Sequence, residues 1–129
     1  MSDDSSPQTP GAVLRERFGH SAFQGDQEAA VNAVLAGRDV LLVTPTGGGK
    51  SVAYQLPALL LDGTTLVVSP LIALMQDQVD ALRRRGIRAS FVNSSLTGKQ
   101  REERLQAATR GEWDLLYVTP ERFRSAAFL

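Results

Sequence analysis

The sequence predicts an α/β protein built on a parallel sheet with flanking helices, because segments of helical periodicity alternate with short apolar runs. Four such runs are expected to form strands: Val40–Val43, Thr65–Ser69, Ala89–Val92 and Leu115–Val118. Unbroken apolar runs are typical of strands buried on both faces, and strands that alternate with helices pair in parallel. Ligands of such sheets bind at the carboxyl ends of the strands, so polar residues at those ends are the candidates for function.

Helices are predicted between the strands. The clearest spans Leu71–Arg85, because its apolar residues share one face and Gly86 follows its end. That face is expected to belong to the core, and it comprises Leu71, Leu74, Met75, Val79 and Leu82. Further helices are predicted over Ala12–Phe18, Asp26–Ala36, Lys50–Leu61 and, as a solvated charged helix, Lys99–Arg110.

Length and composition narrow the class of protein. A chain of 129 residues allows at most one domain, which we expect over residues 11–129 after a disordered tail, 1–10. A net charge of zero and a pI near 6.6 exclude a strongly basic surface, so any nucleic-acid contact must be local. The absence of cysteine is compatible with the cytoplasm, and no apolar stretch approaches the roughly 18 residues of a membrane span.

A phosphate-binding loop is predicted at Thr44–Ser51, between an apolar run and a helix. Its glycines allow backbone N–H groups to surround phosphate oxygens, and the helix N-terminus favours negative charge. Lys50 would neutralise the β- and γ-phosphates, and Ser51 would bind Mg²⁺. Thr44 stands where the general pattern has glycine, and a ligand-free glycine-rich turn is the less favoured alternative. The predicted phosphate-binding residues are Thr46, Gly47, Gly48, Gly49, Lys50 and Ser51.

Three further blocks accompany this loop: Phe18-Gly19-His20-x-x-Phe23-x-x-x-Gln27, the run from Ser69 to Val79, and the run from Tyr117 to Arg122. In this order, the four blocks resemble motifs zero, one, one-a and one-b of the RecQ family of superfamily-two DNA helicases. The resemblance covers about Leu14 to Arg124. It implies the N-terminal part of a RecA-like P-loop domain, with ATP and Mg²⁺ as cofactors and single-stranded and junction DNA as the partner.

The resemblance also implies roles for single residues near the base of the nucleotide. Gln27 matches a glutamine that pairs with the adenine edge, and His20 matches a residue that packs on the base. Gln24 stands where the family usually has an arginine beside adenine. We therefore expect a preference for ATP over GTP, with looser affinity than in relatives that keep the arginine. Lys50 is the expected catalytic residue.

Motifs one-a and one-b imply contacts with DNA at two strand-to-helix junctions. The implied residues are Ser69, Pro70, Leu71, Thr119, Pro120 and Arg122. Free backbone N–H groups at a helix start can bind a DNA phosphate, although plain capping of the turn is the alternative interpretation. The basic residues Arg83, Arg84, Arg85 and Arg88 are better explained as cations that favour a helix C-terminus.

The Asp-Glu-Ala-His box that the family uses for ATP hydrolysis does not occur in this sequence. We therefore expect a fragment of a longer protein or a truncated product, and assign 3′-to-5′ unwinding in replication, recombination or repair to the parent. The alternative is a catalytically inactive nucleotide- or DNA-binding module, and a small P-loop kinase is disfavoured because it would not need the Ser69–Val79 block. The isolated chain is expected to lack DNA-stimulated ATPase activity and to be marginally stable or prone to associate.

Overall fold

The structure is a computed structural model that describes residues 9–42 and 50–120. The chain divides into two compact units, Met1–Asp62 and Gly63–Leu129. In the described residues the first unit is helical, and the second contains a parallel sheet of three strands with two helices. The α/β class with a parallel sheet and flanking helices is confirmed.

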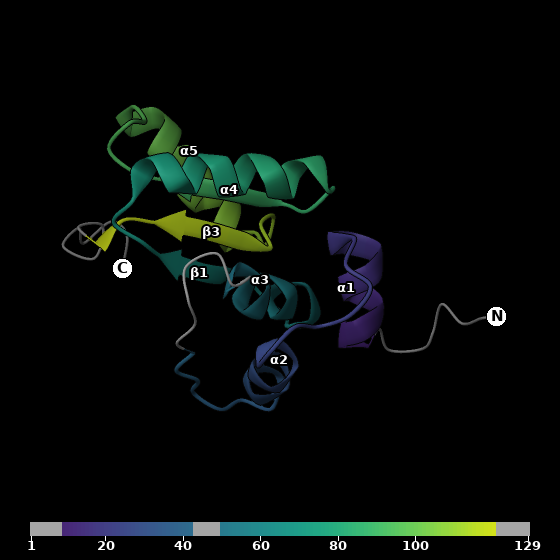
Figure 1. The fold of residues 1–129 in the computed structure, drawn as a ribbon. Coiled ribbons are helices and arrows are strands. Elements are labelled where there is room, and N and C mark those ends of the chain that lie inside the picture. Colours follow the sequence, from purple (N-terminus) through teal and green to yellow (C-terminus); the bar gives the residue numbers. More distant parts are fainter. Residues whose placement is uncertain (1–8, 43–49, 121–129) are drawn as a thin grey trace. The chain divides into compact units, whose positions relative to one another are not determined.

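The first unit contains α1 (Pro10–Phe18), α2 (Gln27–Leu35) and α3 (Lys50–Leu60), close to the predicted bounds (Figure 1). The Thr9 hydroxyl caps α1 by accepting a hydrogen bond from the Ala12 N–H, 3.2 Å away. The apolar side chains that form the core of this unit come from all three helices: Val13, Leu14, Phe18, Ala30, Val31, Val52, Ala53, Leu56 and Ala58.

The strand predicted at Val40–Val43 is wrong for its described part, Val40–Leu42, which is irregular. Leu41 is 90% exposed, although the prediction required burial. Apolar composition favours burial, but a strand also needs a neighbour for its N–H and C=O groups, and the sequence did not specify that neighbour. Two residues of this segment help to line an apolar hollow of about 310 Å³, together with α2 and α3: Ala30, Val34, Val40, Leu42, Ala53 and Tyr54.

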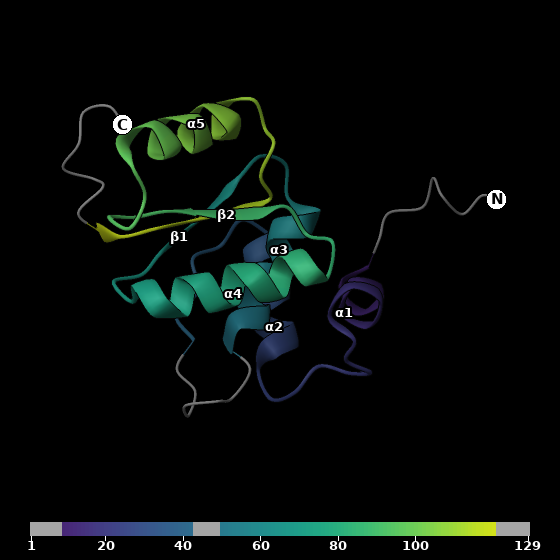
Figure 2. The same cartoon turned by 90° about the horizontal axis from the view of Figure 1, so that it is seen from above.

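The second unit holds β1 (Thr65–Val68), α4 (Ile72–Arg84), β2 (Ala89–Val92), α5 (Gly98–Thr109) and β3 (Leu115–Val118). The strands lie in the order β1-β3-β2 and both pairings are parallel. Figure 2 shows α4 and α5 on opposite faces of this sheet. The last residues of the strands are in register, so the segments that follow them begin side by side at one edge.

The core of the second unit is centred on β3, which is buried along its whole length. On one face, Val92, Leu116 and Val118 form a buried cluster against Leu105, Ala108 and Trp113. Predicted helix residues Met75, Val79 and Leu82 are buried as well.

The prediction that Leu71 and Leu74 belong to the core is wrong, because they are 58% and 44% exposed. Leu71 precedes α4 and has an extended backbone. Leu74 lies one residue, and therefore about 100° around the helix axis, from the buried stripe that begins at Met75. No helix in the described residues is long and apolar enough to cross a membrane.

Candidate nucleotide and nucleic-acid site

The predicted phosphate loop lies mostly outside the described residues. Thr46 to Gly49 fall there, and so does the side chain of Lys50. The backbone of Lys50 begins α3, and Ser51 is its half-buried second residue. The helix therefore starts directly after the glycines, as predicted, and its first N–H groups have no partner within the helix. The phosphate contacts themselves stay a prediction.

The glutamines predicted to lie near adenine are joined to each other. The side-chain oxygen of Gln27 accepts a hydrogen bond from the Gln24 N–H at 2.8 Å, and the Gln27 N–H donates to the Gln24 carbonyl at 3.0 Å. Gln27 is buried, whereas the side chain of Gln24 is exposed. This reciprocal pair orders the turn that enters α2. An adenine contact at Gln27 would therefore have to coexist with the Gln24 contact or displace it.

His20, the third residue predicted near the base, is exposed and follows the end of α1. Gly19 turns the chain there with a positive φ of 73°, and the His20 N–H donates to the Leu14 carbonyl at 3.2 Å. No hydrogen bond joins His20 to either glutamine in the described residues. The structure thus leaves the imidazole on the surface, and its role at a base stays a prediction.

The two predicted DNA motifs meet at the carboxyl edge of the sheet. The Ser69 N–H donates to the Val118 carbonyl at 3.0 Å, so Ser69 and Thr119 extend neighbouring strands. Pro70 and Pro120, the residues that follow them, are both exposed. Arg122 lies outside the described residues. Two blocks that are far apart in sequence therefore form one edge, as expected for a ligand site on a parallel sheet.

At the first of these junctions the helix begins one residue later than the predicted start at Leu71. α4 begins at Ile72, with Leu71 as its N-cap and Pro70 outside the helix. The reason is local: the Ser69 hydroxyl accepts a hydrogen bond from the Leu71 N–H at 3.2 Å, which makes a tight turn before the helix. Ser69 therefore shapes the turn.

Asn93 is a residue at this edge that the sequence interpretation missed. It follows β2, in the position that Ser69 and Thr119 occupy after their strands. Its side chain is fully buried, and its oxygen accepts a hydrogen bond from the Ser95 N–H at 2.8 Å. The sequence feature that could have identified Asn93 is its position directly after an apolar run. Asn93 orders the loop after β2 at the edge where the two motifs meet.

Thr119 has an unusual hydrogen-bonding state. It is only 1% exposed, and its hydroxyl, like that of Ser90 in β2, has no hydrogen-bond partner among the described residues. A buried polar group without a partner costs about 1–3 kcal/mol, so such groups call for an explanation. Polar residues are thus gathered at the carboxyl edge without all being satisfied by the protein itself.

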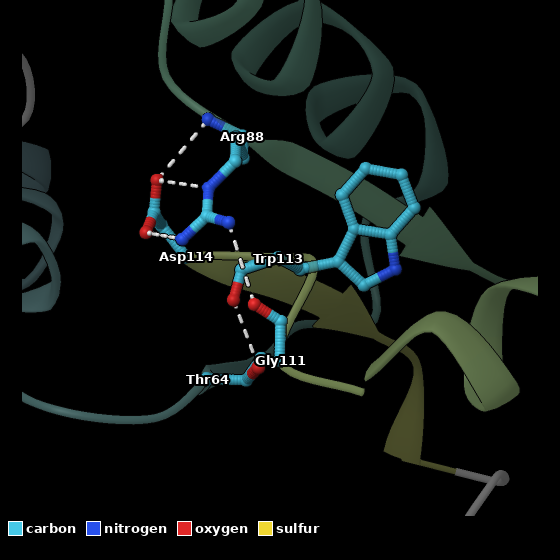
Figure 3. Close-up of polar contacts among 5 residues, drawn as sticks. All are labelled: Thr64, Arg88, Gly111, Trp113 and Asp114. Carbon is cyan, nitrogen blue, oxygen red and sulfur yellow. Dashed lines mark hydrogen bonds and ion pairs between the residues drawn. The ribbon is translucent and has the colours of Figure 1, made fainter. Parts of the chain in front are cut away.

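The amino ends of the strands carry a second polar cluster, in which the groups pair with one another (Figure 3). The guanidinium of Arg88 lies 2.9 Å from the Asp114 carboxylate and also donates to the Gly111 carbonyl at 3.4 Å. The Thr64 hydroxyl donates to the Trp113 carbonyl at 2.8 Å. The hydrogen bond and charge of Asp114 raise the pKa of Arg88 above its ordinary value. Arg88 is therefore engaged in holding strands together.

The other basic residues divide into two groups. Those in the last turn of α4 lie where the sequence predicted them. Arg101 and Arg104 were predicted on a solvated face, but both are half-buried and donate to carbonyl oxygens of Leu96 and Phe91. That prediction is wrong for these two residues, because long arginine stems pack along the protein while their guanidinium groups reach backbone acceptors.

Comparisons with known proteins agree with this architecture. The family model of the DEAD/DEAH box helicases matches residues 24–128. A solved structure described as a hypothetical ATP-dependent RNA helicase from Sulfolobus tokodaii superimposes with a TM-score of 0.70 at 26% identity, over 89% of this chain and 34% of its own. The chain belongs to the DEAD/DEAH box helicase family.

Within this family, the resemblance to RecQ helicases is confirmed. The ATP-dependent DNA helicase RecQ of Haemophilus influenzae is 49% identical over 117 residues, which are 91% of this chain. The protein of the same name from Bacillus subtilis is 44% identical over 119 residues, 92% of this chain. The chain spans only 19% and 20% of the length of these two relatives.

Proposed function

We propose that this chain is the ATP-binding portion of a DNA helicase that couples ATP hydrolysis to 3′-to-5′ strand unwinding in replication, recombination or repair. The observation that carries the proposal is that two features occur together in this chain. A Gly-Gly-Gly-Lys-Ser sequence runs directly into α3, and Ser69 and Thr119 meet at the carboxyl edge of a parallel sheet. Relatives that are 49% and 44% identical to this chain are named ATP-dependent DNA helicase RecQ.

The residues at the start of α3 fit a magnesium nucleotide. An ammonium group and a hydroxyl group occupy its first two positions, Lys50 and Ser51, where free N–H groups favour phosphate oxygens. Lys50 would neutralise phosphate charge, and Ser51 would hold Mg²⁺ with the help of water and phosphate oxygens. When bound, the metal supplies charge stabilisation for phosphoryl transfer. Gln27, Gln24 and His20 are proposed to contact the base.

The proposed DNA contact lies at the carboxyl edge of the sheet in the second unit. Ser69 and Leu71 form a tight turn before α4, whose first N–H groups can bind a phosphate. Pro70, Pro120 and Leu71 are exposed at this edge, and beneath them lies the buried hydroxyl of Thr119, which has no hydrogen-bond partner among the described residues. The site is local, which suits a chain of zero net charge. Single strands and junctions are the proposed partners, with Arg122 as a further contact.

Nucleotide binding tests the first half of the proposal. We expect Lys50→Ala to weaken the binding of a fluorescent ATP analogue in the 129-residue chain at least tenfold, because a charge-assisted contact contributes about 1.5–3 kcal/mol. Lys99→Ala is the matched control, since Lys99 is an exposed lysine of α5 in the other unit. Equal binding of the ATP analogue by wild type and Lys50→Ala would contradict the proposed nucleotide site.

A catalytically inactive binding module is the second candidate, and the absence of an Asp-Glu-Ala-His box in this sequence favours it for the isolated chain. Phosphate release with and without single-stranded DNA shows whether the isolated chain itself hydrolyses ATP. Turnover above that of Lys50→Ala would show that the isolated chain is an enzyme and would contradict the second candidate.

A further inference from the structure

The sheet of the second unit has two edge strands, β1 and β2, and their surroundings differ. Among the described residues, β2 has a neighbouring strand on one side only, because the order is β1-β3-β2. An edge strand presents unpaired N–H and C=O groups, which are a template for pairing with another chain. Proteins therefore protect such edges with charge, proline, bulges or covering segments.

The outward carbonyl groups of β2 can be identified from its register. The Arg88 carbonyl accepts hydrogen bonds from the Asp114 and Leu115 N–H groups, so Arg88 faces β3. Backbone groups alternate in direction along a strand, which turns the carbonyls of Ala89 and Phe91 away from β3. These two oxygens are the acceptors that an added strand would use.

Both oxygens are already occupied by arginine side chains. Arg83 Nε donates to the Ala89 oxygen at 2.8 Å, and Arg104 Nη1 donates to the Phe91 oxygen at 2.9 Å. The Arg104 guanidinium also lies over the Phe91 ring, 4.7 Å from its centre. Arg83 belongs to α4 and Arg104 to α5, which lie on opposite faces of the sheet (Figure 2). Arginine side chains therefore reach the β2 edge from both faces of the sheet.

The guanidinium groups of Arg83 and Arg104 are held near each other although their positive charges repel. Neither arginine forms an ion pair with a carboxylate of the described residues, and burial together with the charge of Arg83 lowers the pKa of Arg104. The hydrogen bonds to β2 and the ring contact hold the two guanidinium groups in place despite their like charge. By contrast, Leu66 and Val68 of β1, the other edge strand, are exposed.

We propose that Arg83 and Arg104 close the β2 edge of the sheet against strand addition by a second copy of the chain. Each guanidinium occupies an acceptor that the incoming strand needs and places a positive charge in its path. A strand from another copy would bring the same two cations, so pairing would need the two arginine hydrogen bonds of each copy to break and four charges to approach. The closure is a property of the sheet and does not depend on nucleotide or DNA.

The test compares two variants of the 129-residue chain that lose the same charge. Arg83→Met/Arg104→Met removes both guanidinium groups and keeps the apolar stems, whereas Arg84→Met/Lys99→Met removes two cations from the same helices. Sedimentation velocity over a concentration series gives the weight-average mass. We expect this mass to rise with concentration toward about twofold for the first variant only, because symmetric dimers are the commonest association. Equal sedimentation of the two variants would refute the proposal.

A third variant identifies the surface through which copies associate. Phe91→Pro added to Arg83→Met/Arg104→Met should restore the sedimentation of the control, because the Phe91 N–H faces away from β3 and proline is tolerated on an edge strand. Association that persists with proline would place the contact elsewhere and overturn the assignment. Circular dichroism checks folding. If the double variant does not fold, the single variants Arg83→Met and Arg104→Met test the proposal instead. Each uncovers one carbonyl of β2 and should associate more than Arg84→Met.

Discussion

The two ends of the sheet in the second unit are built from similar polar residues but are used differently. At the amino end, Arg88, Asp114, Thr64 and the backbone of Trp113 satisfy one another across all three strands (Figure 3). At the carboxyl end, Ser69 and Asn93 shape local turns, and the Thr119 hydroxyl has no hydrogen-bond partner within the described part of the chain.

This difference separates polar groups that maintain the fold from those available for a ligand. Groups that pair with each other lose little on folding and add rigidity, while a buried group without a partner lowers stability. The amino end therefore fixes the strands, and the carboxyl end is where DNA is proposed to bind. Substitutions at the amino end should change stability most, and those at the carboxyl end should change binding most.

Trp113→Ala is expected to have the largest effect on stability. The indole packs against the cluster of Val92, Leu116 and Val118 and donates a hydrogen bond to the Arg104 carbonyl at 3.1 Å. Loss of a large, half-buried aromatic side chain should lower the free energy of unfolding by about 2–4 kcal/mol, measured by urea denaturation. Trp113→Phe, the control, should lose less than half as much. Equal losses in both variants would mean that packing at this end contributes little.

Asp114→Ala should have an intermediate effect, seen as a lower midpoint of thermal unfolding. The carboxylate accepts hydrogen bonds from the backbone N–H and the guanidinium of Arg88, so its loss loosens β2 from β3. Glu112→Ala is the control, because the Arg110–Glu112 pair joins two exposed side chains and exposed pairs contribute little. If Asp114→Ala and Glu112→Ala melt at the same temperature, the polar pairs at the amino end of the sheet do not stabilise the fold as proposed.

Thr119→Val should change stability least and DNA binding most. Valine has nearly the same shape and removes a hydroxyl that bonds to none of the described residues, so the free energy of unfolding should stay within about 1 kcal/mol of wild type. Fluorescence anisotropy with single-stranded DNA should show about tenfold weaker binding, the loss of one hydrogen bond to a phosphate. Thr65→Val is the control at the opposite end of a strand. Unchanged affinity would place the DNA contact elsewhere.

Local sequence signals predicted most of the helices and the strands of the second unit within a residue or two. Thr9 and Gly19 frame α1, and Thr97 with Gln100 forms a capping box at the start of α5. Such signals act between residues that are near in sequence, so they can be recognised without the fold. The meeting of Ser69 and Thr119 was also predictable, because parallel strands gather their carboxyl ends at one edge.

Sequence interpretation failed where the outcome depended on distant partners. The apolar run that begins at Val40 was assigned to a strand, although strand formation needs a neighbour that the run itself does not specify. Arg104 was assigned to a solvated face, since the carbonyl of Phe91, 13 residues away, was not known to lie within its reach. Asn93 was overlooked because nothing near it in sequence showed that the end of its strand would lie beside the strand that precedes Thr119.

The sequence by itself therefore determined the α/β class, the helix starting at Lys50 and the candidate residues at the strand ends, because periodicity, glycines and caps act locally. The tertiary structure alone decided the strand order β1-β3-β2, the pairing of Arg88 with Asp114 and the closure of the β2 edge by Arg83 and Arg104. Hydrogen bonds and ion pairs across long sequence separations depend on which segments the packing brings together, and composition and periodicity do not contain that information.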